Sequence, residues 1–123
     1  MIQAKPFAIT LAVLFLSISL YGCATVPPAP QTADQTVFAT KALHAAVAGT
    51  TTDLLTANVI DVDTAQAIYD DLQRTQEPIN TAVGMARSGE VIPDDTLARI
   101  NLIQDLLQQW QDKLLAKQAE AAQ

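Results

Sequence analysis

Apolar residues recur every three or four positions through most of the chain after residue 33, which is the spacing of one face of an α-helix. Three such segments are separated by short polar or glycine-containing stretches. Because each segment has a single apolar stripe, the three can bury their stripes only against one another. The sequence therefore predicts an all-α fold, an antiparallel up-down-up bundle of three helices over residues 34–118. Residues 119–123 contain only Ala, Gln and Glu, and we expect them to fray.

The first predicted helix begins with Asp34 as its N-cap and ends at Asn58, a residue suited to a left-handed cap. Alanines flank its apolar stripe, and small residues allow a neighbouring helix to approach closely. The segment 49–52 reads Gly-Thr-Thr-Thr, which has low helix propensity and could mark a bend.

The second predicted helix starts between Asp61 and Thr64 and stops at Ser88 and Gly89. Pro78 interrupts it, and a proline inside a helix removes one backbone donor at a cost of about 3 kcal/mol. The apolar register nevertheless continues through the proline. We therefore favour one kinked helix over two separate helices.

The third helix has the clearest signals. Pro93 supplies a rigid start, and Asp94 and Asp95 follow it where the helix dipole favours negative charge. Lys113 and Lys117 fall near the carboxyl end, where the dipole favours positive charge.

The predicted core takes apolar residues from all three stripes. They are Leu43, Val47, Leu54, Ile68, Leu72, Ile79, Val83, Leu97, Ile100, Ile103, Leu107, Trp110 and Leu114. The third helix also carries Leu102, Leu106 and Leu115, which exceed what one packing seam requires. We favour a wide core-facing stripe; the alternative is a helical interface with a second copy or another protein.

Two segments 32 residues apart, 59–64 and 91–96, share an apolar pair followed by acidic residues and a threonine. A repeat of this length is typical of helical solenoids, but solenoids need three or more units. We interpret the similarity as one helix-start pattern that occurs twice.

The first 22 residues follow a different pattern. Lys5 precedes an apolar run over residues 6–20 that is broken only by one threonine and two serines. The run is shorter than the roughly 20 residues that a membrane span needs. It is typical of a cleaved secretory signal peptide.

The signal ends in Leu20, Tyr21, Gly22 and Cys23, and this segment resembles the lipobox of bacterial lipoproteins. The resemblance covers residues 1–23. It implies a diacylglyceryl group on the Cys23 sulfur, cleavage between Gly22 and Cys23, and an acyl chain on the new amino terminus. Two or three acyl chains would attach the protein stably to a lipid bilayer. The alternative is an unmodified Cys23 in an uncleaved inner-membrane anchor.

Ala24 occupies the position after the lipidated cysteine. In Gram-negative lipoproteins an aspartate there commonly retains the protein at the inner membrane, so the resemblance implies the outer membrane, on its periplasmic or surface face. A Gram-positive source would place the protein on the outer face of its single membrane. Residues 23–33 contain three prolines and no charged side chain. They read as a tether that could extend by up to roughly 30 Å.

From Cys23 onward the chain has six Lys and Arg against thirteen Asp and Glu, a net charge of −7. Nucleic-acid binding needs clustered cations, so this balance argues against it. It also argues against electrostatic docking onto anionic lipid headgroups. Cys23 is the only cysteine, so no disulfide can form within the chain.

Candidate chemistry is sparse. His44 is the only histidine, and no second histidine or nearby cysteine completes a zinc site, so we predict a residue at the boundary of the core. The segment around Asp61 and Asp63 lacks the glycine and the closing glutamate of a calcium loop. We expect no metal and no cofactor apart from the lipid on Cys23.

Two adjacent carboxylate pairs, Asp70 with Asp71 and Asp94 with Asp95, could suggest acid–base catalysis. Neighbouring side chains on a helix point about 100° apart, so neither pair converges on one substrate. We interpret them as solvated faces and helix caps. The sequence predicts neither enzymatic activity nor a small-molecule substrate.

These observations lead to a membrane-anchored lipoprotein that acts as a non-catalytic helical interaction module in the bacterial envelope. Its partner would be another envelope protein or a second copy of the chain. The alternative is a phage-encoded lipoprotein, either a spanin-like partner in outer-membrane lysis or a superinfection-exclusion protein. Spanin-type lipoproteins are usually shorter and proline-rich throughout, whereas helical patterns dominate this chain.

Overall fold

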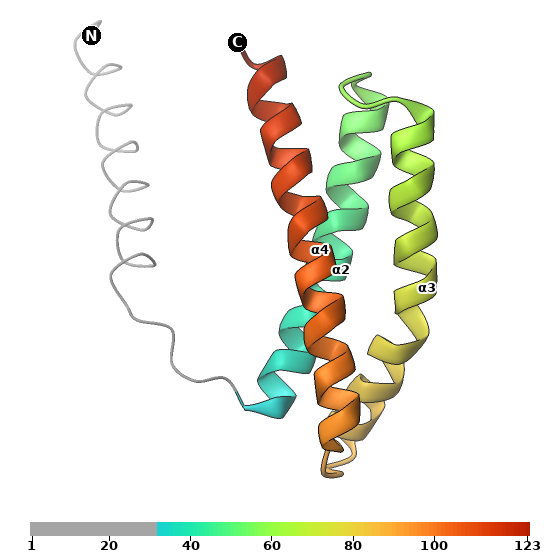
Figure 1. Cartoon of the computed structure of the whole chain (residues 1–123), viewed down its shortest axis with the longest axis vertical. Helices are drawn as coiled ribbons and strands as arrows, with labels where there is room; N and C mark the ends of the chain where they lie inside the picture. Colours follow the sequence, from blue (N-terminus) through green and yellow to red (C-terminus); the bar gives the residue numbers. More distant parts are fainter. Residues whose placement is uncertain (1–31) are drawn as a thin grey trace, which may run out of the picture. The chain divides into compact units, whose positions relative to one another are not determined.

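The computed structural model describes residues 32–123, which form three helices and no strand. Helix α2 spans Ala33–Thr56, α3 spans Val62–Arg87 and α4 spans Asp94–Ala121. They run antiparallel in succession (Figure 1). The predicted all-α three-helix bundle is confirmed.

The bundle has two distinct ends (Figure 1). The start of α2 and the turn over residues 88–93 lie at one end. The turn over residues 57–61 and the carboxyl terminus lie at the other. Each turn is short, so successive helices are neighbours.

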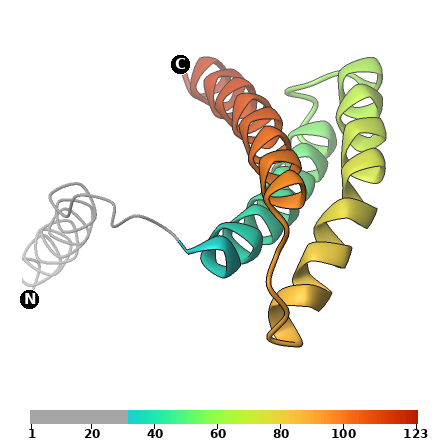
Figure 2. The same ribbon diagram turned by 60° about the horizontal axis from the view of Figure 1, so that its bottom comes forward.

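Helix α2 is the common packing partner of the other two. Both α3 and α4 contact α2 extensively but contact each other much less. Figure 2 shows α2 running behind the space between them. Small side chains explain this arrangement, because the alanines and threonines of α2 let two helices approach it closely.

Several threonines of α2 are buried, and their hydroxyls are satisfied within the helix itself. Thr40 donates to the Thr36 carbonyl at 2.8 Å, and Thr51 donates to the Val47 carbonyl at 2.7 Å. Such bonds remove the cost of burying a hydroxyl without requiring a polar group on another helix. The helix continues through residues 49–52, although this segment has low helix propensity.

Ten of the thirteen predicted core residues are buried, and the other three, Leu43, Leu97 and Trp110, are partly buried against them. The prediction missed Val37, Ala65 and Ala82, which are small residues on the helices. It also missed Ile60 and Ile92, which are buried just before α3 and α4 begin. The two similar segments thus each close one end of the core with an isoleucine.

The N-cap of α2 is Thr32, so the prediction of Asp34 was wrong by two residues. The Thr32 hydroxyl accepts the Gln35 N–H at 3.2 Å, and the Gln35 side-chain oxygen accepts the Thr32 N–H at 3.0 Å. This capping box satisfies two backbone donors at once, whereas an aspartate cap satisfies one backbone donor. Asp34 lies in the first turn instead.

The ends of α2 and α3 match the sequence signals. Asn58 has a φ of 59°, the left-handed conformation expected of it, and Gly89 has a φ of 71°. Pro78 lies inside a single helix, as predicted. Figure 1 shows α3 changing direction in its yellow portion, where Pro78 lies.

The third helix differs from expectation in two respects. Leu102 is 70% exposed and Leu115 is 48% exposed, so the preferred explanation that the core requires the extra leucines is wrong for these two. Helix α4 also continues to Ala121, through most of the predicted tail. As a result Lys117 precedes the last turn, which holds no basic residue, and pairs with Glu120 at 3.8 Å.

Leu107 and Leu102 on α4 allow a matched test of this packing. Leu107 is 0% exposed, so we expect Leu107→Ala to lower the free energy of unfolding by about 2–5 kcal/mol. Leu102→Ala should change it by less than about 0.5 kcal/mol. Denaturant unfolding followed by circular dichroism measures both, and equal losses would contradict the packing of α4.

The start of α3 gives a pH-dependent expectation. Asp61 caps the helix by accepting the Thr64 N–H at 2.8 Å. Hydrogen bonds from the Thr64 side chain and backbone hold the pKa of the Asp61 carboxyl below its usual range. The cap therefore stabilises the fold above the unfolded pKa of an aspartate, and that contribution is lost as pH falls through the folded pKa.

Asp61→Asn keeps a neutral cap at every pH. The Tm of the wild type should therefore fall further than the Tm of this variant as the solution is acidified. Asp63→Asn removes the same charge from the first turn without removing the cap, and it should follow the wild-type profile. Parallel profiles for the wild type and Asp61→Asn in thermal melts would contradict the assignment.

Candidate functional site

The residues predicted to carry the lipid and its processing lie outside the described residues 32–123. These are Leu20, Tyr21, Gly22, Cys23 and Ala24. Lipidation, cleavage and sorting therefore stay predictions. Within the described range, no helix has the length and apolarity needed to cross a membrane.

His44 is partly buried between α2 and α3. Its Nε2 lies 2.9 Å from the Leu72 carbonyl oxygen. In the tautomer with a proton on Nε2, the imidazole donates a hydrogen bond to that oxygen. Leu72 lies less than two turns before Pro78, in the part of α3 that leads into the proline. His44 lies at the boundary of the core, as the sequence predicted, and its hydrogen bond joins α2 to α3. Among residues 32–123, no group of three or more His, Cys, Asp or Glu is placed to hold a metal ion.

The two members of the Asp70–Asp71 pair have different environments. Asp70 is exposed and accepts a hydrogen bond from Gln66 at 2.9 Å. The Asp71 side chain is only 14% exposed, pairs with Arg74 and accepts the Trp110 indole N–H at 2.8 Å. The interpretation of Asp71 as a solvated residue was wrong, because it links α3 to α4.

Asp94 and Asp95 are exposed in the first turn of α4, in keeping with their predicted role at the helix start. Asp95 accepts the N–H of Thr96 at 2.9 Å. The formal N-cap of α4 is Pro93, which makes no side-chain cap bond. Both carboxylates thus place negative charge near the amino end of the helix dipole, and Asp95 also satisfies one backbone donor.

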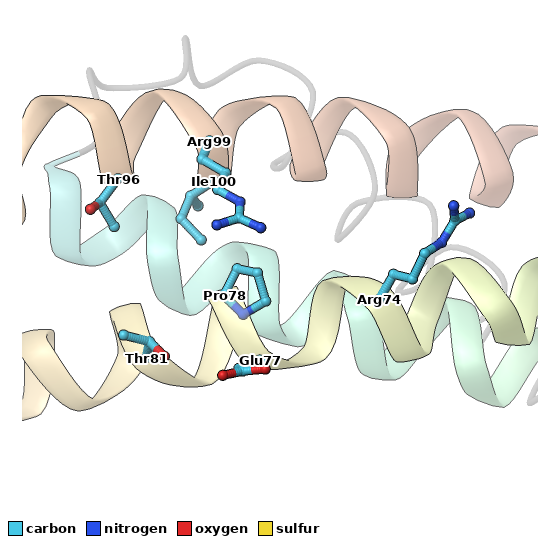
Figure 3. Close-up of a pocket in the computed structure, with 7 residues that line it drawn as sticks. All are labelled: Arg74, Glu77, Pro78, Thr81, Thr96, Arg99 and Ile100. Carbon is cyan, nitrogen blue, oxygen red and sulfur yellow. The ribbon is translucent and has the colours of Figure 1, made fainter.

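Two pockets lie between α3 and α4, where these helices pack on α2 more than on each other; together we call them the α3/α4 groove. Its first pocket has a volume of about 350 Å³. Figure 3 shows Arg99 of α4 directed toward Pro78 in the space between the helices, while Arg74 extends from α3 toward α4 farther along. The lining residues are Arg74, Glu77, Pro78, Thr81, Thr96, Arg99 and Ile100.

The second pocket of the groove lies between the amino-terminal part of α3 and the carboxyl-terminal part of α4. Its volume is about 240 Å³, and its open surface is apolar. The lining residues are Ile60, Thr64, Ile68, Trp110, Lys113, Leu114, Ala116 and Lys117. The pocket thus combines an apolar floor with two lysines at its edge.

Trp110 and Asp71 connect the two helices in the middle of the groove. Trp110 lines the second pocket, Arg74 lines the first, and both bind the Asp71 carboxylate. The Lys113 ammonium lies 4.9 Å from the centre of the Trp110 ring, within the range of a cation–π interaction. The indole is therefore fixed at its N–H edge and at its face.

One stripe of α4 follows the groove at steps of three and four residues, which places its members on one side of the helix. The stripe has cations at both ends and large apolar residues between them: Arg99, Leu102, Leu106, Trp110, Lys113 and Lys117. We call it the α4 stripe. Leu102 is exposed and Leu106 is partly buried, so part of its apolar surface lies uncovered.

The groove also concentrates the positive charge of the domain. Residues 32–123 contain six lysines and arginines, and four of them line its two pockets: Arg74, Arg99, Lys113 and Lys117. Thirteen acidic side chains are distributed over the same range. A sequence search at helical spacing could have found the α4 stripe, but only with the cations counted together with the apolar positions.

These groups suit noncovalent binding. Cations, an indole and aliphatic side chains can hold an anionic and partly apolar surface, and Asp71 is already bound to Trp110 and Arg74. Comparisons with protein-family models, with curated proteins and with solved structures found no match.

The Trp110–Asp71 link generates a quantitative expectation. Trp110→Phe leaves the Asp71 carboxylate with one donor fewer and should lower the free energy of unfolding by about 1–3 kcal/mol. A double-mutant cycle with Asp71→Ala should give a coupling energy of about 1 kcal/mol, measured by denaturant unfolding. The cycle of Trp110→Phe with Asp70→Ala is the control and should give no coupling. Equal coupling in both cycles would contradict the link.

Proposed function

We propose that this protein is a lipid-anchored protein of the bacterial envelope whose helical domain binds another protein without catalysing a reaction. The observation that carries the binding role is the α3/α4 groove, where an apolar pocket, an exposed leucine and four cations share one face. Exposed apolar surface bordered by polar groups is typical of protein interaction sites.

The anchoring role is supported by the segment Leu20–Cys23, which resembles a lipobox, and by the apolar run before it. Each buried methylene of an acyl chain contributes about 0.8 kcal/mol, so two chains suffice for stable attachment. Ala24 after the cysteine favours the outer membrane. The proline-containing residues 23–33 would then serve as a spacer between the lipid and the helices.

The arrangement of ionisable groups supports binding over catalysis. A general acid–base pair needs two groups that reach one reacting atom. His44 contacts the Leu72 carbonyl between α2 and α3, whereas Asp71 is bound in the α3/α4 groove. The two groups therefore serve different helix pairs.

A combined experiment tests both halves of the proposal. The mature protein should have the mass of residues 23–123 plus a diacylglyceryl group, with or without a third acyl chain on the amino terminus, and it should partition with membranes. A photo-crosslinking amino acid at position 102 should give one discrete adduct in cells, because this position lies on the uncovered part of the α4 stripe. Whole-protein mass spectrometry and gel analysis measure the two results.

The same crosslinker at Ala45, an exposed position on α2, is the matched control and should give no such adduct. Cys23→Ser should abolish the lipid mass and leave the protein with its leader attached. An unmodified wild-type mass would overturn the anchoring role. Equal adducts from positions 45 and 102 would overturn the binding role.

A further inference from the structure

We propose that the occupant of the α3/α4 groove is an acidic amphipathic helix of a partner protein, which packs on α3 and α4 as the fourth helix of a bundle. This inference deepens the proposed function, since it rests on the groove being the binding site and adds the chemistry of the partner. It follows from the shape, the apolar surface and the charge of the groove.

The packing of the three helices supplies the shape. Because α3 and α4 both pack on α2 but little on each other, they leave a groove between them on the side away from α2. The α4 stripe from Arg99 to Lys117 covers 18 residue steps, which is about 27 Å at 1.5 Å per residue. The two pockets lie along this length of α4, which matches a partner helix of about five turns.

The apolar residues indicate that the partner helix is amphipathic. The pocket beside Trp110 is floored by Ile68 and Leu114 and has room for a large apolar side chain. Leu102 and Leu106 extend this surface along α4 toward Arg99. A helix with apolar residues at steps of three and four would cover the pocket and both leucines together.

The charges indicate that the partner helix is acidic. Among the described residues, Arg99 and Lys113 have no carboxylate within ion-pair distance, whereas Arg74 pairs with Asp71 and Lys117 pairs with Glu120. Glu77 is the one carboxylate among the residues that line the two pockets. Acidic residues beside the apolar stripe of a partner would form ion pairs with these two cations at close range.

Two other occupants fit less well. If two copies met groove to groove, the four cations of one would face the four cations of the other, and like charges oppose such a contact. An anionic lipid surface is flat, whereas the two pockets lie between helices. A separate acidic helix therefore remains the favoured occupant.

The test uses the full-length lipoprotein in a non-ionic detergent and a synthetic 18-residue helical peptide with Leu at steps of three and four and Glu and Ala elsewhere. Fluorescence anisotropy of the labelled peptide gives the Kd. The emission of Trp110, the only tryptophan of the chain, should change as the peptide binds. The double variant Arg99→Glu/Lys113→Glu should weaken binding about tenfold, because it replaces two attractions with two repulsions.

The matched control is Lys41→Glu/Arg87→Glu, which makes the same change in net charge at the two cations outside the groove and should alter the Kd by less than about twofold. All four positions are exposed, so circular dichroism should confirm that each variant is folded. Equal weakening by both double variants would overturn the proposal, since net charge alone would then explain binding.

Three further outcomes also overturn it. The first is equal affinity for the peptide with Lys in place of Glu. The second is stronger binding to anionic phospholipid vesicles than to the peptide. The third is a dimer in analytical ultracentrifugation that Arg99→Glu/Lys113→Glu disrupts. If the peptide fails to bind but the crosslinked adduct at position 102 forms, the acidic helix is wrong while the binding module stands.

Discussion

The fold depends on one packing constraint: the side chains of α2 are small enough for α3 and α4 to pack against it at the same time. Its buried positions are filled by threonines, valines and one leucine, with alanines beside them. Because α3 and α4 both settle against this helix, they have little need to contact each other. A larger set of side chains on α2 would push its neighbours apart and weaken the whole bundle.

Directional bonds then fix how the helices sit on α2. Tyr69 of α3 shares a 2.7 Å hydrogen bond with Thr52, and His44 reaches the Leu72 carbonyl at 2.9 Å. Across the groove, the Trp110–Asp71 bond is the only side-chain hydrogen bond between α3 and α4 found in residues 32–123. Apolar burial supplies most of the stabilisation, while these bonds select one rotation of each helix.

Periodicity in the sequence was sufficient for the three helices and for most of the core, because a stripe identifies which face of a helix is buried. It could not identify which helix each face meets. Asp71 and Trp110 are 39 positions apart, and nothing local to either residue indicates the other. The exposure of Leu102 could not be predicted for the same reason. A wide apolar stripe has the same sequence pattern whether its neighbours cover all of it or leave one edge exposed. The misplaced N-cap reflects a competition between two good capping residues, Thr32 and Asp34.

The direction of α2 makes the two ends of the bundle different, because the chain enters at one of them. The chain joins the bundle at Thr32, beside the turn over residues 88–93 and therefore near the pocket with Arg99 (Figure 1). The pocket with Trp110 belongs to the other half of α4. Because Thr32 and the arginine pocket share one end of the bundle, the two pockets differ in their distance from the point at which the chain enters it.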